Sequence, residues 1–397
     1  MEQVSDRLAK LTASATIAMN QRSKDLQAEG IDVINLSVGE PDFNTPDHIK
    51  EAAKKAIDDN YSFYPPVAGY PALKNAIVEK LKKHNGLEYT PDQIVVSNGA
   101  KHSIVNVLLS IINPGDEVII PAPYWVSYAE QVKISEGTGV ILDTDFETGF
   151  KVTPEQVEQA ITPKTRAFMI CSPSNPTGAV YSKDELEALV RVLAPHDRII
   201  IISDEIYEHI NYVGKHESIG QFDRVRDRVV LVNGVSKGYA MMGWRLGYMA
   251  APAWIANAVI KLQGQFTSGV TTVGQMAAIT ALTGDQGPTK AMNKTFRRRR
   301  DLVLSHMDGI EGVKCAVPEG AFYVFPDMSA YFGKSVEGKL IKDSVDLCMY
   351  LLESGHIATV PGSAFGAPDC VRISFATSDE NLEKAMERLK NALSNMS

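Results

Sequence analysis

The sequence is poor in cysteine and has no long apolar run. Its 397 residues include only 4 cysteines, which lie far apart and form no closely spaced pair. This pattern excludes a zinc knuckle and a redox dithiol, and it predicts free buried thiols. No apolar run reaches the roughly 18 residues of a membrane span, and Asp6, Arg7 and Lys10 interrupt any signal-peptide core. We therefore expect a cytoplasmic protein without a membrane segment.

Positive charge is also in the minority. The chain has 40 Lys and Arg residues against 48 Asp and Glu residues, a formal net charge of −8. No broad positive field is available to attract a phosphate backbone, so nucleic acid is excluded as the expected partner. Hydrophobic residues make up 44% and charged residues 22%, which is ordinary globular usage and excludes a disordered or coiled-coil chain. The length predicts two or three domains.

Short apolar runs alternate with helical patterns through the middle of the chain. Most of these runs are continuous and rich in β-branched residues, as expected for strands buried on both faces of a parallel sheet. They cover 94–97, 117–120, 167–171, 199–202 and 229–232. Helical stretches such as 102–112 and 183–193 lie between them, and Ser182 with Glu185 forms a capping box before the second. The alternation predicts a doubly wound α/β domain over 46–289.

The pattern changes near residue 290. A long charged helix (295–308), two short strands around 313–325 and a final helix (379–395) predict a separate α+β unit over 290–397. Residues 1–45 contain a helix and an extended segment without a core of their own, so we expect them to pack on that unit. The four arginines at 297–300 lie within a helical pattern of an acidic chain, which favours a solvated helix face over a nucleic-acid patch.

Residues that follow the apolar runs are the candidates for a site, because ligands bind beyond the carboxyl ends of strands in open α/β sheets. After 94–97, the segment 98–101 (Asn-Gly-Ala-Lys) begins a helix and can hold a phosphate through backbone N–H groups, although a tight turn is an equally good explanation. After 117–120, Trp125 offers a surface on which a planar ring can stack, with core packing as the alternative.

Three further strand ends carry polar side chains. Asn175 lies between two prolines, which fix the backbone around its amide. Asp204 follows a run of isoleucines, so its carboxylate needs a cation or a protonated ring nitrogen nearby, unless it is an ordinary helix cap. Lys237 follows 229–232, and desolvation would turn its amine into a Schiff-base former. Arg245 lies eight residues farther on.

Two motifs imitate other functions. Residues 234–238 (Gly-Val-Ser-Lys-Gly) match the nucleophile elbow of a hydrolase, but no histidine lies in an obvious strand-end loop to complete a triad. Residues 137–139 (Gly-Thr-Gly) lack the third glycine of a dinucleotide fingerprint, and no histidine pair has metal-ligand spacing. We therefore disfavour a hydrolase, which stays an alternative from another function class, and predict no metal.

Together these segments resemble the class I/II aminotransferases of the aspartate aminotransferase family. The resemblance rests on the order and spacing of several motifs and extends over nearly the whole chain; they are 36–43 (LSVGEPDF), 175–178 (NPTG), 204–207 (DEIY), Ser236-Lys237, 243–247 (GWRLG) and Arg372. It implies fold type I: a large domain with a mostly parallel seven-stranded sheet flanked by helices, and a small α+β domain built from both termini. It also implies pyridoxal 5′-phosphate as cofactor and a homodimer with shared active sites.

The resemblance assigns a role to each matched residue. Lys237 would hold the cofactor as an internal aldimine and then move the proton during a ping-pong reaction, and Asp204 would keep the ring nitrogen protonated. Asn175 and Tyr207 would bind the ring 3′ oxygen, and Trp125 would stack on the ring. The residues that would clamp the phosphate are Gly99, Ala100, Lys101, Ser236, Arg245 and, from the neighbouring subunit, Tyr64. Gly234 stands where many relatives have serine, which puts one phosphate contact in doubt.

The resemblance also predicts the substrate. Arg372 would bind the α-carboxylate as a bidentate fork, assisted by Gly39 and Asn175, with Trp125 also lining the substrate site. Lys101 and Thr16 resemble the bacterial subgroup in which this lysine faces the distal carboxylate, so aspartate and 2-oxoglutarate are the expected pair. An aromatic or prephenate specificity is the alternative. A carbon–sulfur or cyclopropane-forming lyase shares the scaffold, whereas a transcription regulator would need a winged helix for which 1–31 leaves no room.

Overall fold

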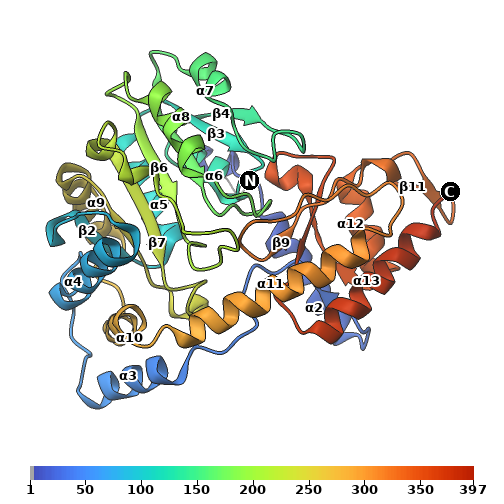
Figure 1. The fold of residues 1–397 in the computed structure, drawn as a ribbon, viewed down its shortest axis with the longest axis horizontal. Coiled ribbons are helices and arrows are strands. Elements are labelled where there is room, and N and C mark those ends of the chain that lie inside the picture. The colour runs from blue at the N-terminus through green and yellow to red at the C-terminus, as the bar shows by residue number, and fades with distance from the viewer. Residues whose placement is uncertain (1–3) are drawn as a thin grey trace.

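A seven-stranded sheet forms the centre of the larger part of the molecule (Figure 1), in a computed structural model that describes residues 4–397. Its strand order is β2-β8-β7-β6-β5-β3-β4, and only β8 runs antiparallel to the others. The strands are β2 (Ile94–Ser97), β3 (Glu117–Ala122), β4 (Thr138–Asp143), β5 (Thr165–Cys171), β6 (Ile200–Asp204), β7 (Val229–Gly234) and β8 (Gly247–Ala250). The sequence predicted five of these strands within one or two residues, but not β4 or β8.

Helices cover both faces of this sheet because alternate strand residues point to opposite sides. On β5, Ala167 and Met169 pack with one group of helices, whereas Phe168 and Ile170 pack with another. The helices are α3 (Asp47–Asp58), α4 (Pro71–Lys80), α5 (Ala100–Ile111), α6 (Ser127–Ile134), α7 (Pro154–Ala160), α8 (Lys183–Leu193), α9 (Ala253–Phe266) and α10 (Thr272–Thr283). The predicted capping box begins α8, where Ser182 and Glu185 bond each other's backbone N–H.

Both ends of the described chain contribute to a smaller part (Figure 1), in which buried residues of α2, α12 and α13 share one hydrophobic core. A three-stranded sheet has the order β13-β14-β9, and β1 pairs in parallel with β12. The bounds are α1 (Asp6–Ala9), α2 (Ala15–Ala28), β1 (Ile34–Asn35), α11 (Gly287–Met307), β9 (Tyr323–Val324), β10 (Ser335–Val336), β11 (Lys339–Leu340), α12 (Ser344–Glu353), β12 (Ile357–Ala358), β13 (Val360–Pro361), β14 (Val371–Ser374) and α13 (Asp379–Ser394). The β1–β12 pairing agrees with the expected packing of the N-terminal segment on the C-terminal unit.

Some expectations need correction. Only β9 lies within 313–325, because Lys314 forms an isolated bridge with Asp327 and not a strand. The charged helix begins at Gly287, so the predicted boundary between 289 and 290 falls inside α11. The division into 1–45, 46–289 and 290–397 stays a prediction, and residues 1–3 lie outside the described part.

The described residues also bear on the cysteines and on membrane spans. All four cysteines are free. No helix within 4–397 is both long and apolar enough to cross a membrane.

Candidate active site

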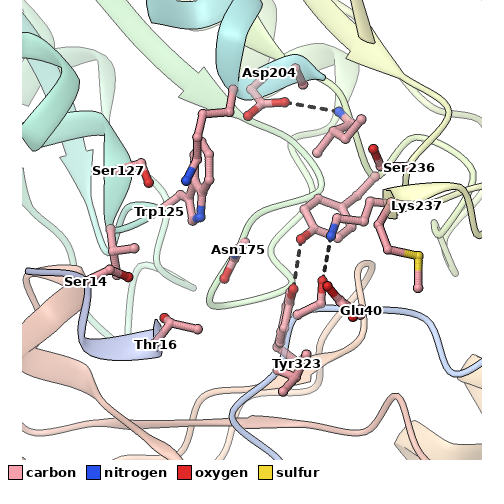
Figure 2. A pocket seen from close by; sticks show the side chains of 18 of the residues that line it. Ser14, Thr16, Glu40, Trp125, Ser127, Asn175, Asp204, Ser236, Lys237 and Tyr323 are labelled. Atoms are coloured by element: carbon pink, nitrogen blue, oxygen red, sulfur yellow. Dashed lines mark hydrogen bonds between the residues drawn. The ribbon is translucent and has the colours of Figure 1, made fainter. Parts of the chain in front are cut away.

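A cavity of about 530 Å³ opens at the carboxyl ends of β5, β6 and β7. The smaller part closes it from the other side with residues of β9 and β14, and the N-terminal segment adds Thr16 and Gly39. Figure 2 shows Trp125 and Lys237 on opposite sides of this space. The predicted residues that line it are Thr16, Gly39, Ala100, Lys101, Trp125, Asn175, Asp204, Tyr207, Ser236, Lys237, Arg245 and Arg372.

Lys237 follows β7 and supplies an amine to the cavity. Its Nζ donates a hydrogen bond of 2.5 Å to the carbonyl oxygen of Gly39 (Figure 2). Withdrawal from water lowers the pKa of Lys237 to about 8, although the negative charge of Glu40 opposes this effect. A lower pKa gives a larger fraction of the neutral amine near pH 7, and the neutral amine is the nucleophilic form.

Asp204 ends β6 and is 4% exposed. Burial raises its pKa to about 6, and a hydrogen bond of 2.6 Å from the Tyr128 hydroxyl limits the rise. The backbone N–H of Ile206 donates a second bond to the same carboxylate at 3.2 Å. This carboxylate therefore lacks a full countercharge, and a cationic group in the cavity would stabilise it.

Arg372 comes from β14 and reaches the cavity from the side opposite the large sheet. One guanidinium nitrogen donates to the Asn175 side-chain oxygen at 3.0 Å and another to the Ser37 carbonyl at 2.5 Å. The guanidinium lies 4.5 Å from the ring centre of Tyr323 and 5.0 Å from that of Phe365. Its Nε is buried without a hydrogen-bond partner among the described residues. A guanidinium that carries a positive charge and an unused N–H donor can bind a carboxylate.

A second candidate anion site lies at the start of α5. Gly99 caps this helix with φ 87°, and its missing Cβ leaves space for the Arg245 guanidinium, which a side chain at position 99 would strike. Arg245 has φ 54° and bonds the carbonyl oxygens of Met242 and Asn98 at 2.8 and 3.3 Å. A helix N-terminus next to a guanidinium favours a phosphate or another anion.

The comparisons with known proteins agree with this geometry. Residues 31–389 match the family model described as aminotransferase class I and II. The chain belongs to this family.

Curated relatives and solved structures support the same assignment. The aspartate/prephenate aminotransferase of Cereibacter sphaeroides is 48% identical over 390 residues, which are 98% of each chain. The aspartate aminotransferase of Rhizobium meliloti superimposes with a TM-score of 0.97 at 43% identity over 100% of both chains. The Thermus thermophilus enzyme with maleate gives a TM-score of 0.93 at 42% identity over 99% and 100%. The protein is an aminotransferase with the predicted fold type I architecture, and members of this family depend on pyridoxal 5′-phosphate.

Two predicted residues of the aminotransferase do not line the cavity. Gly99 lies directly beside it as the cap of α5. Tyr64 is 96% exposed and its neighbour Phe63 is 80% exposed. Its role across a dimer interface stays a prediction.

The structure gives a physical reason for Gly234. On the antiparallel pair β7 and β8, Gly234 lies opposite Gly247. A Cβ at position 234 would come within 2.9 Å of the Gly247 Cα and the Leu246 carbonyl oxygen. Serine therefore does not fit here without a backbone shift, and the glycine follows from the close approach of the two strands.

Sequence reasoning missed two tyrosines of the site. Tyr128 lies on α6 and bonds Asp204, and Tyr323 lies on β9 and bonds Tyr207 at 2.8 Å (Figure 2). Tyr128 lies on a helix six residues beyond the end of β3, and Tyr323 belongs to a separate sheet, so a search of the residues immediately after each strand of the large sheet does not find them. The lining of the cavity contains no histidine, which leaves Ser236 without the base of a hydrolase triad.

Proposed function

We propose that the chain is a pyridoxal 5′-phosphate-dependent aminotransferase that moves the amino group of aspartate to 2-oxoglutarate, giving oxaloacetate and glutamate by a ping-pong mechanism. The observation that carries the proposal is the grouping of three charged side chains in one cavity. They are the Lys237 amine, the Asp204 carboxylate and the Arg372 fork. These groups match, in order, a covalent anchor, a partner for a protonated ring and a carboxylate receptor.

The residues fit the cofactor in three respects. The start of α5 with Arg245 and Ser236 suits its phosphate, because backbone N–H groups and a guanidinium converge there. Asp204 suits a protonated ring nitrogen, which would supply the missing countercharge. Trp125 offers a flat surface on the cavity wall for the ring. When bound, the cofactor accepts the electrons released at the substrate α-carbon.

The chain's own residues would then hold and move protons. Lys237 would anchor the cofactor covalently and, once displaced, carry a proton to and from the substrate α-carbon. Asp204 would retain the proton on the ring nitrogen, and Tyr207 and Asn175 would hydrogen-bond the 3′ oxygen. Tyr207 is 4% and Asn175 6% exposed, so little water reaches these contacts.

Lys101 supports a dicarboxylate as substrate. It lies on the first turn of α5, with its amine 4.9 Å from the ring centre of Trp125. Withdrawal from water and the nearby Arg245 lower the pKa of Lys101. A cation is disfavoured at this end of a helix, so an anion is expected beside it. Thr16 has a buried hydroxyl oxygen without a described partner and also faces the cavity.

We assign the α-carboxylate to Arg372, with Gly39 and Asn175 assisting, and the distal carboxylate to Lys101 and Thr16. The Thermus thermophilus relative was solved with maleate, which is also a dicarboxylate. Prephenate is a second candidate, because the Cereibacter sphaeroides relative is named for aspartate and prephenate. Prephenate carries two carboxylates as well, so Lys101 would serve either substrate.

The exposed Tyr64 supports a homodimer in which it reaches the phosphate of the neighbouring subunit. An aromatic side chain that is 96% exposed suits an interface better than water. The cytoplasmic location and the three-part domain division remain predictions from the sequence.

Lys101→Ala tests the choice of substrate. We expect kcat/KM for aspartate to fall by about tenfold to a thousandfold, the loss of one charged contact in the transition state. Activity toward phenylalanine should barely change, because its side chain offers the lysine no anion. Lys133→Ala is the matched control, since Lys133 pairs with Glu130 at 2.8 Å and does not line the cavity. An equal fall for both substrates would assign Lys101 to the phosphate and remove the argument for a dicarboxylate.

A further inference from the structure

The Tyr323 hydroxyl connects the two halves of the site. It lies 2.8 Å from the Tyr207 hydroxyl, and both side chains are buried, with 0% and 4% exposure. Neither hydroxyl has another hydrogen-bond partner among residues 4–397. Tyr207 belongs to the segment after β6, whereas Tyr323 belongs to β9 of the small sheet. This hydrogen bond, together with the one from Arg372 to Asn175, therefore joins the two structural parts at the cavity wall.

The position of Tyr323 is fixed by its surroundings. Strand pairing places Tyr323 opposite Ser374 on the strand that carries Arg372. Its ring supports the Arg372 guanidinium at 4.5 Å. Its hydroxyl lies so close to Gly39 that a Cβ there would come within 2.6 Å of it. The hydroxyl thus has little freedom to turn away from Tyr207.

Proton counting sets the direction of the bond once the cofactor is present. A tyrosine hydroxyl has one proton to donate. If Tyr207 donates its proton to the cofactor 3′ oxygen, the proton between the two hydroxyls must come from Tyr323. A hydroxyl that accepts a hydrogen bond is a stronger donor, because bonds in a chain polarise one another.

We propose that Tyr323 is a positioning residue with two separable effects: its hydroxyl directs the Tyr207 proton toward the cofactor, and its ring supports Arg372. The inference rests on the proposed function. Donation to the 3′ oxygen stabilises negative charge on that oxygen, which makes the lysine–cofactor linkage lose its proton at lower pH. Removal of the Tyr323 hydroxyl therefore raises the pKa of that linkage.

Spectroscopic titration of the holoenzyme tests the hydroxyl. The probe is the pH midpoint at which the absorption band of the lysine-bound cofactor changes. Tyr207→Phe should raise it by about one to two pH units, as expected for losing a bond to a charged oxygen. Tyr323→Phe should raise it by about 0.1 to 0.6 unit, because a neighbouring bond contributes some 10–30% of that strength.

A double variant separates a relay from general loosening. In the Tyr207→Phe background, Tyr323→Phe should leave the midpoint unchanged, because the hydroxyl then has nothing to orient. Tyr212→Phe is the matched control: its hydroxyl donates to the Ala321 carbonyl in the same segment, outside the cavity, and the midpoint should not move. An equal shift in both backgrounds, no shift in Tyr323→Phe, or an equal shift in Tyr212→Phe would each overturn the proposal. A wild type without any lysine-bound band would instead overturn the proposed function itself.

Maleate binding tests the ring. Tyr323→Phe keeps the ring and should leave the dissociation constant of maleate within about twofold. Tyr323→Leu removes the ring and should weaken maleate binding by about threefold to thirtyfold, the range of a guanidinium–ring contact. If the phenylalanine variant weakened maleate as much as the leucine variant, the ring would not be the supporting element. The phenylalanine variant alone still decides the hydroxyl, whether or not the leucine variant folds.

Discussion

Tyr128→Phe should change the pH range over which Asp204 is charged. The Tyr128 hydroxyl donates a 2.6 Å hydrogen bond to the Asp204 carboxylate, and Tyr128 is 2% exposed. Hydrogen bonds to charged groups contribute about 1.5–3 kcal/mol, which corresponds to one to two pKa units. The pKa of Asp204, which burial raises to about 6, should therefore rise by about one to two further units in the variant.

The sign of the effect on stability follows from linkage. Asp204 has a higher pKa in the folded chain than the ordinary 3.8 of an aspartate, so the folded state binds its proton more tightly. Stability from this proton is present at low pH and is lost as the pH rises toward about 6. In Tyr128→Phe the loss of stability continues into the range of about pH 7 to 8. Above that range, the total loss of unfolding free energy should exceed that of the wild type by about 1.5–3 kcal/mol.

Urea unfolding of the cofactor-free chain between pH 5 and pH 9 measures this loss. As the pH rises, the free energy of unfolding of Tyr128→Phe should decrease more than that of the wild type. In the Tyr128→Phe background, Asp204→Asn should abolish this additional pH dependence. Tyr181→Phe is the control, because Tyr181 is 4% exposed and its hydroxyl accepts a bond from the Val152 N–H, away from Asp204. Parallel curves for wild type and Tyr128→Phe would refute the reasoning.

Three further changes test other parts of the structure. Lys237→Ala should abolish turnover but leave part of the cofactor affinity, and borohydride treatment of the wild type followed by peptide mapping should label Lys237; a label on another lysine would refute the anchor. Arg372→Ala should cost about 2–5 kcal/mol in kcat/KM, and Arg372→Lys should restore it only partly because an ammonium lacks the planar fork; unchanged kinetics would place the α-carboxylate elsewhere. Lys80→Met should lower the free energy of unfolding by up to about 3–5 kcal/mol, because it removes the buried ammonium paired with Glu208 and leaves that buried carboxylate only the Asn85 amide and His209. Urea unfolding should show a smaller loss in Lys80→Met/Glu208→Gln; an equal loss would contradict the ion-pair argument.

The sequence predicted five strands of the large sheet but not β4 or β8. Continuous β-branched runs identify β5, β6 and β7 because both of their faces are covered. Strand β4 lies at one edge of the sheet, with every residue exposed or half-exposed, and β8 begins with Gly247 and has no β-branched residue. Strands that are exposed or lack β-branched residues give no such continuous signal, so pattern reasoning does not detect them.

The residues of the site likewise fall into a predicted group and a missed group. Lys237, Asp204 and Asn175 follow strands of one sheet, so topology alone brings them together. Tyr128 reaches Asp204 from a helix, and Tyr323 reaches Tyr207 from a separate sheet. Contacts of this kind depend on how the layers pack, which the local sequence does not encode. The resemblance to a family located Arg372, but no periodicity in the chain did.

The reversed direction of β8 positions the proposed phosphate site at the start of α5. Because β8 runs against its neighbours, its first residue lies at the edge where β6 and β7 finish, and Arg245 reaches that edge from just before a strand. Gly247 then lies between Gly234 and the backbone of Gly99 and Ala100, where a Cβ would strike α5. Because neither facing glycine has a side chain, the N-terminus of α5 can pack directly against the ends of β7 and β8. A side chain at position 247 would clash with the backbone of Gly99 and Ala100, so the start of α5 would have to shift.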